Sequence, residues 1–272
     1  MSSSTLPRLG RVRDLVLRHP TAGSTAMLAL IIVLWEVIFG VVKTIAVVPP
    51  PSAIVGALAE QPSFYWESLL TTAEEAAIGL ALGVSFALLL SALSLISRTV
   101  EDNAFSLAVV LNSIPLIVLA PLLVLWFGGG LTPRVTIAAL AVFFVVFVNV
   151  VRGLKAVSRE RRELFMVMGA SRTQQFWRLQ VPSSLPYLLS ALKIAAVGSL
   201  FGAVIGEWVG ANSGLGVVLI FSLYQFQTDQ LWVAMMLITA VALVFYAVVG
   251  FAERIIIPWH ESVRKPRLEI ER

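Results

Sequence analysis

Six apolar segments constrain the fold of this chain more than any other feature of its sequence. They cover residues 22–42, 68–96, 104–127, 133–151, 184–206 and 231–257. A helix needs about 20 apolar residues to cross the hydrocarbon core of a bilayer. Backbone groups in lipid must pair within their own segment, so such segments are helices. The sequence therefore predicts an all-α membrane protein with six transmembrane helices.

The basic residues fall almost entirely on one side of this six-helix arrangement. Those on the side of the N-terminus are Arg8, Arg11, Arg13, Arg18, Arg98, Arg152, Lys155, Arg159, Arg161, Arg162, Arg172, Arg178, Arg254, Arg264, Lys265, Arg267 and Arg272. Only Lys43 and Arg134 fall on the other side, and Lys193 lies within the fifth segment. Basic residues collect on the cytoplasmic side of membrane proteins. We therefore predict that both termini are cytoplasmic, and we attribute the net charge of +4 to the membrane topology and not to nucleic-acid binding.

Composition narrows the class of protein further. The chain is 58% hydrophobic and only 13% charged, whereas about a quarter of the residues of a soluble domain are charged. It has no Cys, and its two His residues, His19 and His260, lie outside the apolar segments. We therefore expect no metal site, no catalytic residues and no cofactor bound by this chain.

The domain organisation follows from the six segments. The first segment is long enough to be retained as a membrane helix, unlike the short apolar core of a cleaved signal peptide. We predict a cytoplasmic tail over residues 1–21, a single transmembrane domain over residues 22–260 and a second cytoplasmic tail over residues 261–272. The domain includes an inner loop over residues 152–183.

Two outer loops and two glycine pairs carry local signals. Pro49, Pro50 and Pro51 break any helix, and Ser52 is placed to cap a short surface helix over residues 53–58. The other outer loop covers residues 207–230. Glycines four residues apart share one face of a helix and allow close packing. The pairs are Gly79 with Gly83 and Gly198 with Gly202. Glycines merely scattered in membrane helices are the alternative.

The inner loop is far longer than a connection between neighbouring helices needs. Residues 159–178 are predicted to form two short helices, interrupted at Gly169, with Ser171 capping the second. We expect one face to pack on the membrane domain and the other to face water. The first face comprises Leu164, Phe165, Met168 and Phe176, and the second comprises Arg161, Arg162, Arg172 and Arg178. An amphipathic helix that only anchors to headgroups is the alternative.

The spacing of Glu163, Gly169 and Pro182 in this loop resembles the EAA loop of permease subunits of bacterial ABC importers. That loop reads Glu-Ala-Ala, three residues, Gly, nine residues, then Ile-x-Leu-Pro. Here Leu164 and Phe165 replace the alanines, and residues 179–182 read Leu-Gln-Val-Pro. The loop also lies between the fourth and fifth helices, as in the smaller importers of type I. The resemblance extends over about residues 45–260.

Further local similarities point to one branch of these importers. They are Pro50-Pro51-Ser52, Pro121-Leu122, Leu125-Trp126-Phe127-Gly128, Leu185-Pro186 and Ser213-Gly214-Leu215-Gly216. They resemble the branch that imports nitrate, sulfonates, taurine and pyrimidine precursors of thiamine. Residues 253–260, which read ERIIIPWH, favour the pyrimidine members. The resemblance thus implies a small organic solute such as a pyrimidine, or a sulfonate or nitrate anion, as substrate.

The resemblance also implies a mechanism and a set of partners. The inner loop would dock as a coupling helix on a separate ATPase, with Glu163, Met168, Gly169, Ala170, Ser171 and Pro182 as the coupling residues. Two ATP-binding subunits would carry ATP and Mg²⁺, since this chain has no G-x-x-x-x-G-K-[ST] phosphate loop. A second permease copy, most simply as a homodimer, and an extracytoplasmic binding protein would complete the assembly in the bacterial inner membrane.

Polar residues within the apolar segments, and the pair at the outer end of the fifth segment, are candidates for the translocation pathway, because polar groups at membrane depth are costly without a partner or water. The candidates are Asn112, Ser113, Asn149, Lys193, Glu207 and Trp208. Asn112 and Ser113 precede Pro115 and fit either the pathway or a structural kink. Glu207 fits either a gate or an interfacial position, and Lys193 suits an anionic substrate better.

Two other function classes remain to be weighed. A secondary transporter or channel driven by an ion gradient would typically show inverted repeats, and no repeat is evident. A membrane-embedded enzyme would need titratable groups gathered at one depth, whereas the carboxylates here are scattered. The ATP-driven importer therefore leads, with the secondary transporter as the alternative.

Overall fold

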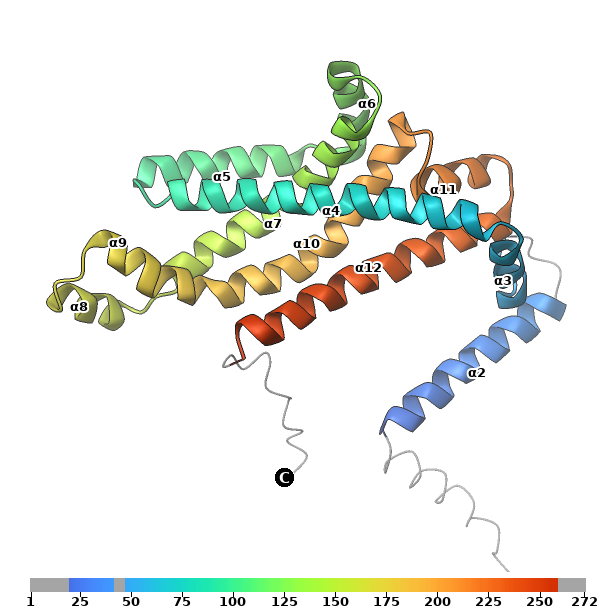
Figure 1. Cartoon of the computed structure of the whole chain (residues 1–272), viewed down its shortest axis with the longest axis horizontal. Coiled ribbons are helices and arrows are strands. Elements are labelled where there is room, and N and C mark those ends of the chain that lie inside the picture. Colours follow the sequence, from blue (N-terminus) through green and yellow to red (C-terminus); the bar gives the residue numbers. More distant parts are fainter. Residues whose placement is uncertain (1–19, 42–46, 259–272) are drawn as a thin grey trace, which may run out of the picture. The chain divides into compact units, whose positions relative to one another are not determined.

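The computed structural model describes residues 20–41 and 47–258, and the ordered elements within these ranges are all helices (Figure 1). The α-helices are α2 (Pro20–Val41), α3 (Pro51–Glu60), α4 (Pro62–Leu93), α5 (Arg98–Ser113), α6 (Leu116–Phe127), α7 (Leu131–Lys155), α8 (Arg159–Val167), α9 (Arg172–Gln175), α10 (Val181–Gly210), α11 (Leu215–Tyr224) and α12 (Thr228–Ile256). A π-helical turn, η1 (Phe176–Gln180), joins α9 to α10. The all-α prediction is thus confirmed for the described residues. The predicted tails lie outside them, except for residues 20 and 21, which begin α2.

The chain divides into two compact units. The smaller unit comprises the described residues up to Pro62 together with Ser222–Val233, and the larger comprises Ser63–Phe221 and the described residues from Ala234 onward. Each unit has its own internal contacts. The prediction of one transmembrane domain over residues 22–260 stays a prediction.

The centre of the larger unit is the packing of α7 against α10, which run side by side (Figure 1). A Cβ atom on Gly202 of α10 would lie 2.6 Å from the Cα atom of Ala138 on α7. On α4, a Cβ on Gly83 would lie 2.5 Å from the carbonyl oxygen of Ala139, and Gly79 meets Ala138 at similarly close range. The close-packing prediction is therefore confirmed for these three glycines. Gly198 is different, since its nearest neighbour would be a carbonyl oxygen 3.7 Å away.

Aromatic side chains fill the remainder of this core. Phe143 and Phe147 of α7 are buried and stack with ring centroids 5.8 Å apart. Phe105 of α5 packs on Phe147 at 5.1 Å. These contacts bury the apolar faces of α5 and α7 against each other.

The described helices include fewer continuous membrane spans than the six predicted. Four are long and apolar enough to cross a membrane, namely Pro62–Leu93, Leu131–Lys155, Arg172–Gly210 and Thr228–Ile256. Helix α2 has 22 residues, and its described apolar part is Thr25–Gly40. The described residues therefore contain four continuous spans, or five if the bent pair α5 and α6 counts as one span. The sequence predicts six. The count of six and the orientation of the termini stay predictions.

The third predicted span is broken, as the sequence around Pro115 indicated. Helices α5 and α6 meet at 95° across the break between Ser113 and Leu116. Ile114 has extended backbone angles, with φ −82° and ψ 122°. A residue before proline is disfavoured in the helical region, and proline itself has no N–H to donate. The structural kink that the sequence allows before Pro115 is thus confirmed, as a break within the apolar segment 104–127.

In the smaller unit, the predicted helix cap at Ser52 is wrong. Helix α3 begins at Pro51, and Pro50 is its N-cap residue without a side-chain hydrogen bond. Proline suits the first helical turn because the N–H that it lacks would have no partner there. The hydroxyl and the backbone N–H of Ser52 instead donate to the carboxylate of Glu36 on α2, at 2.6 and 2.9 Å. Ser52 therefore ties α3 to α2.

Two tryptophans hold the rest of this unit together. The indole N–H of Trp35 donates to the carbonyl of Pro49, and that of Trp232 donates to the carbonyl of Val47, each at 3.1 Å. The two rings lie 5.3 Å apart. The segment Ser222–Val233 is thereby fixed beside α2 and the loop that precedes α3.

Candidate functional site

The inner loop over residues 152–183 forms the predicted pair of short helices. Ser158 caps α8, with its hydroxyl accepting a hydrogen bond from the N–H of Arg161 at 3.5 Å. Glu160 lies in the first turn of α8, where hydrogen bonds from its own backbone N–H and from Ser158 lower the pKa of its carboxyl. These interactions define where α8 starts, directly after α7 ends at Lys155.

The turn between α8 and α9 depends on a glycine. Gly169 has φ 72°, a conformation that costs other residues energy. The N–H of Ala170 donates to the carbonyl of Phe165 at 3.0 Å, a bond typical of helix ends with such a residue. Ser171 and Gln174 then form a reciprocal capping box, with hydrogen bonds of 3.3 and 2.9 Å. The predicted interruption at Gly169 and the cap at Ser171 are both confirmed.

Pro182 lies where the loop enters α10. It lacks the N–H that would donate to the carbonyl of Arg178 four residues earlier. The turn directly before it, Phe176–Gln180, is π-helical, with the N–H of Val181 donating to Phe176. A wider turn at this point is the expected response to a proline inside a continuous helical path. Helix α9 thus continues through η1 into α10.

The face of the loop that was predicted to pack on the membrane domain is only partly buried. Phe165 and Phe176 are half-buried, and Phe176 packs against the core of α7 and α10. Leu164 and Met168, however, are 58% and 73% exposed, so the prediction that they pack inward is wrong. Helix α8 has no buried residue and projects from the unit, so nothing in the described chain covers them.

The loop therefore carries an exposed apolar patch at its turn. We define the loop patch as Leu164, Met166, Val167 and Met168, of which Val167 is 86% exposed. Glu163 lies beside the loop patch, and its Oε1 accepts a hydrogen bond from Nε of Arg159 at 2.7 Å. Exposed pairs of this kind contribute little to stability. Contiguous exposed apolar side chains mark a contact surface for another molecule.

The candidate pathway residues do not form one cluster. Asn112 and Ser113 are exposed at the end of α5, and the Ser113 hydroxyl donates to the carbonyl of Val109 in its own helix at 2.7 Å. Asn149 of α7 likewise donates to Val145 at 2.7 Å. Three of the six candidates thus lie apart from Glu207, and their place in a pathway stays a prediction.

Lys193 has a partner that sequence reasoning did not identify. It forms an ion pair with Glu253, which joins α10 to α12, and its ammonium lies 5.9 Å from the ring centroid of Tyr246. One turn further along α10, an apolar pocket of about 390 Å³ lies between these helices, lined in part by Phe201, Leu243 and Tyr246. The charge that suited an anionic substrate is therefore balanced within the protein.

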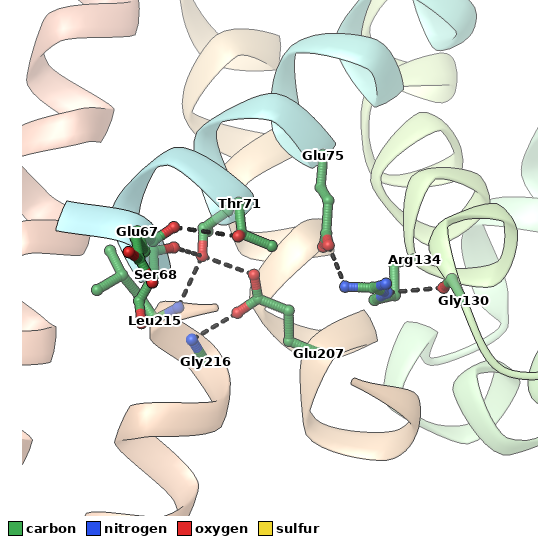
Figure 2. A network of polar contacts seen from close by, with 10 residues as sticks. Glu67, Ser68, Thr71, Glu75, Gly130, Arg134, Glu207, Leu215 and Gly216 are labelled. Carbon is green, nitrogen blue, oxygen red and sulfur yellow. Dashed lines mark hydrogen bonds and ion pairs between the residues drawn. The ribbon is translucent and has the colours of Figure 1, made fainter. Parts of the chain in front are cut away.

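Glu207 lies at the centre of a buried polar network (Figure 2). It is 1% exposed, and its carboxylate accepts hydrogen bonds from the hydroxyl of Thr72 on α4 at 2.6 Å and from the N–H of Gly216 on α11 at 2.5 Å. The Thr72 hydroxyl oxygen in turn accepts a hydrogen bond from the N–H of Leu215 at 2.8 Å. Three helices, α4, α10 and α11, are thus joined through one carboxylate.

The glycines of the Ser213-Gly214-Leu215-Gly216 motif explain how α11 comes so close. Gly214 has φ 119°, and a Cβ atom there would collide with the Glu207 carboxylate. A Cβ atom on Gly216 would lie 2.6 Å from Oε2 of Glu207. The motif wraps around the carboxylate because its backbone has no side chain in the way. Trp208, the next residue on α10, is exposed and takes no part.

A second ion pair lies beside this network and was missed by sequence reasoning. Arg134, in the first turn of α7, pairs with Glu75 of α4 and donates from Nε to the carbonyl of Gly130 at 2.7 Å (Figure 2). The sequence predicts only that Arg134 lies on the outer side. The other carboxylate oxygen of Glu75 is buried and has no hydrogen-bond partner among the described residues. The signal available was that a buried carboxylate in a membrane helix requires a cationic partner.

The sequence and the fold are similar to those of known transport proteins. Residues 79–261 match the family described as binding-protein-dependent transport system inner membrane component. The formylaminopyrimidine transport permease protein ThiX of Halalkalibacterium halodurans is 34% identical over 88% of this chain and 96% of its own length. The riboflavin transport system permease protein RibX of Chloroflexus aurantiacus is 30% identical over 93% and 96%. A chain of the crystal structure of an amino acid ABC transporter with histidines has a TM-score of 0.61 and 19% identity, over 75% of this chain and 98% of that one.

Proposed function

We propose that this chain, which belongs to the family of binding-protein-dependent transport system inner membrane components, couples solute import to a separate ATPase through its inner loop. The chain is a permease subunit of an ABC importer. The energy of ATP hydrolysis would reach the permease through its inner loop. The observation that carries the proposal is the loop patch, which projects on a rigid turn and which nothing in the described chain covers.

The geometry of the loop suits the transmission of force. Gly169 and the Ser171 capping box fix the angle between α8 and α9 with local hydrogen bonds. Helix α9 continues through η1 into α10, which packs along α7. A displacement of the loop patch would therefore move α10 directly. Docking of the loop patch in an ATPase cleft would couple closure of two ATPase subunits to a change between inward-open and outward-open permease states.

The remaining parts of the assembly follow from the same proposal. Two ATP-binding subunits would hold ATP and Mg²⁺. A second permease copy would complete the passage. The protein would reside in the bacterial inner membrane with six crossings and both termini in the cytoplasm, because the basic residues then face inward. Lipid surrounds the exposed apolar faces of the spans.

An extracytoplasmic binding protein would dock on the predicted outer loops. In the smaller unit, α3 and the segment after α11 enclose a polar pocket of about 440 Å³ lined in part by Glu60, Gln227 and Asp229. Phe226 at its rim has φ 57° and is 89% exposed. An aromatic side chain held in a strained backbone conformation and offered to solvent supports a protein contact there.

The substrate class that we propose is a small nitrogen heterocycle. The two relatives reported above are named for formylaminopyrimidine and for riboflavin, and each is at least 30% identical to this chain. The ion pair of Lys193 with Glu253 supports the same choice, since it leaves less positive charge to attract an anion. Sulfonate or nitrate is the competing substrate class.

One experiment tests the coupling proposal. The full chain is purified in detergent from its native membrane together with whatever it binds, and the ATPase activity of the preparation is measured. We expect an ATPase to co-purify, and we expect a chain with residues 159–178 replaced by a Gly/Ser linker to lose it. A chain that purifies alone, and that transports in an ion gradient without ATP, would instead be a secondary transporter.

A further inference from the structure

A pocket lined by basic side chains lies on the inner side of the loop, between α8, α9 and the ends of α4 and α7. We define it as the basic pocket, with a volume of about 390 Å³. Its cationic lining is Lys155, Arg162 and Arg172. Gln175 adds an amide, and Leu95 and Phe176 supply apolar surface. The basic pocket is thus distinct from the loop patch, which faces away from the unit.

The charge in the basic pocket is only partly balanced. Lys155 forms an ion pair with Glu101 in the first turn of α5. Neither Arg162 nor Arg172 forms an ion pair with any residue that the structure describes. Guanidinium groups present a planar fork of donors that matches a phosphate group. Two such groups around one pocket favour an anionic ligand with several acceptor oxygens.

The position of the basic pocket along the chain sets the depth at which this ligand would lie. Lys155 is the last residue of α7, and Leu95 lies two residues after the end of α4. Both helices are long enough to span a membrane. The basic pocket therefore lies where hydrocarbon gives way to lipid headgroups. The neighbouring residues Ile96 and Trp177 are 71% and 63% exposed, which suits the membrane interface.

We infer that the basic pocket binds the phosphate group of an anionic phospholipid headgroup. Arg162 and Arg172 hold the phosphate oxygens, while Leu95 and Phe176 contact the apolar part of the lipid. Binding joins both short helices of the loop to the end of α7 through one ligand, and so stiffens the loop against the membrane domain. This headgroup would belong to the cytoplasmic leaflet, and only that placement rests on the proposed function.

The test uses the full chain with any ATPase that co-purifies, in detergent, titrated with short-chain phosphatidylglycerol and read by native mass spectrometry. The pocket variant is Arg162→Gln with Arg172→Gln. The matched control is Arg161→Gln with Arg178→Gln, which removes the same charge from positions that are exposed like Arg162 and Arg172 but do not line the basic pocket. We expect the pocket variant to lose affinity on the order of 30-fold, because it removes both guanidinium groups that would donate charge-assisted hydrogen bonds to the phosphate. We expect the control to retain it within about threefold.

Three results would overturn the inference. Equal losses in the pocket variant and the control would mean that only the overall charge of the loop attracts lipid. Displacement of the lipid by inorganic phosphate that binds as tightly would assign the basic pocket to free phosphate. Loss of lipid whenever the ATPase is bound would assign it to acidic side chains of that partner. If no ATPase co-purifies, the proposed coupling fails, but the titration of the chain alone still decides the lipid site.

Discussion

Replacing Thr72 by Val tests whether the buried network holds α11 in place. The substitution keeps the shape of the side chain and removes one hydroxyl group. That hydroxyl donates to Glu207 at 2.6 Å and accepts from the N–H of Leu215 at 2.8 Å. The variant would leave a buried carboxylate oxygen and a buried backbone N–H without this partner. Each unsatisfied group costs about 1–3 kcal/mol.

The cost falls on the local attachment of α11, because Glu207 retains its second hydrogen bond to Gly216. If about 2 kcal/mol is lost locally, the equilibrium for opening shifts roughly 30-fold toward the open state. Hydrogen exchange measured on residues 211–224 should therefore speed up by about that factor in Thr72→Val. Exchange in the middle of α7 should not change.

The matched control is Thr71→Val on the adjacent position. The Thr71 hydroxyl donates only to the carbonyl of Glu67 in its own helix, at 3.0 Å (Figure 2). The same atoms are removed, but no contact between helices is lost. Exchange in residues 211–224 should match the unmodified protein. Equal exchange in both variants would refute the claim that the hydroxyl of Thr72 anchors α11.

Three further substitutions test the loop and the core. Glu163→Ala should leave the permease folded, since its ion pair is exposed, but should lower ATPase stimulation about fivefold or more; normal uptake would count against its coupling role. Gly169→Val should lower transport further than Gly169→Ala, because a β-branched residue strongly disfavours φ 72°; full activity would mean that the turn tolerates other conformations. Gly202→Val should lower the free energy of unfolding by about 1–3 kcal/mol or more, because the side chain would be overpacked against Ala138. Gly198→Val has room and should lower the free energy of unfolding less. Equal shifts in the unfolding temperature of the two variants would contradict the close packing.

Local signals in the sequence were enough to predict the architecture of the loop. Gly169 and Ser171 act on their immediate neighbours, so a turn and a helix cap follow from residue type and spacing. Pro115 acts in the same way on α5 and α6. The helical class followed from the length of the apolar segments, because lipid leaves few alternatives.

The errors came from features that depend on distant parts of the chain. Periodicity placed Leu164 and Met168 on one face of α8, but it does not show whether anything covers that face. Ser52 follows three prolines, and this local pattern predicts a helix cap. Its actual partner, Glu36, lies 16 residues earlier, where a local pattern does not reveal it. Which helices pack together decides whether a side chain is covered and which distant residue it contacts.

The ion pairs illustrate the same limit. Glu75 and Arg134 are 59 residues apart, and Lys193 and Glu253 are 60 apart. The cost of an unpaired charge in lipid indicates that each needs a partner, and only the packing of α4, α7, α10 and α12 identifies it. The sequence therefore singled out Lys193 but neither of these two ion pairs.

Contact between the loop patch and an ATPase is the central claim, and a cross-link tests it most directly. The chain has no Cys, so Met168→Cys introduces a single thiol at a side chain that is 73% exposed. Leu125→Cys, at an 81% exposed position on α6, is the control. The account predicts that a thiol-to-amine cross-linker joins Met168→Cys, but not Leu125→Cys, to a co-purifying ATPase, with a yield that changes on adding ATP. No cross-link from Met168→Cys, or equal yields from both positions, would contradict it.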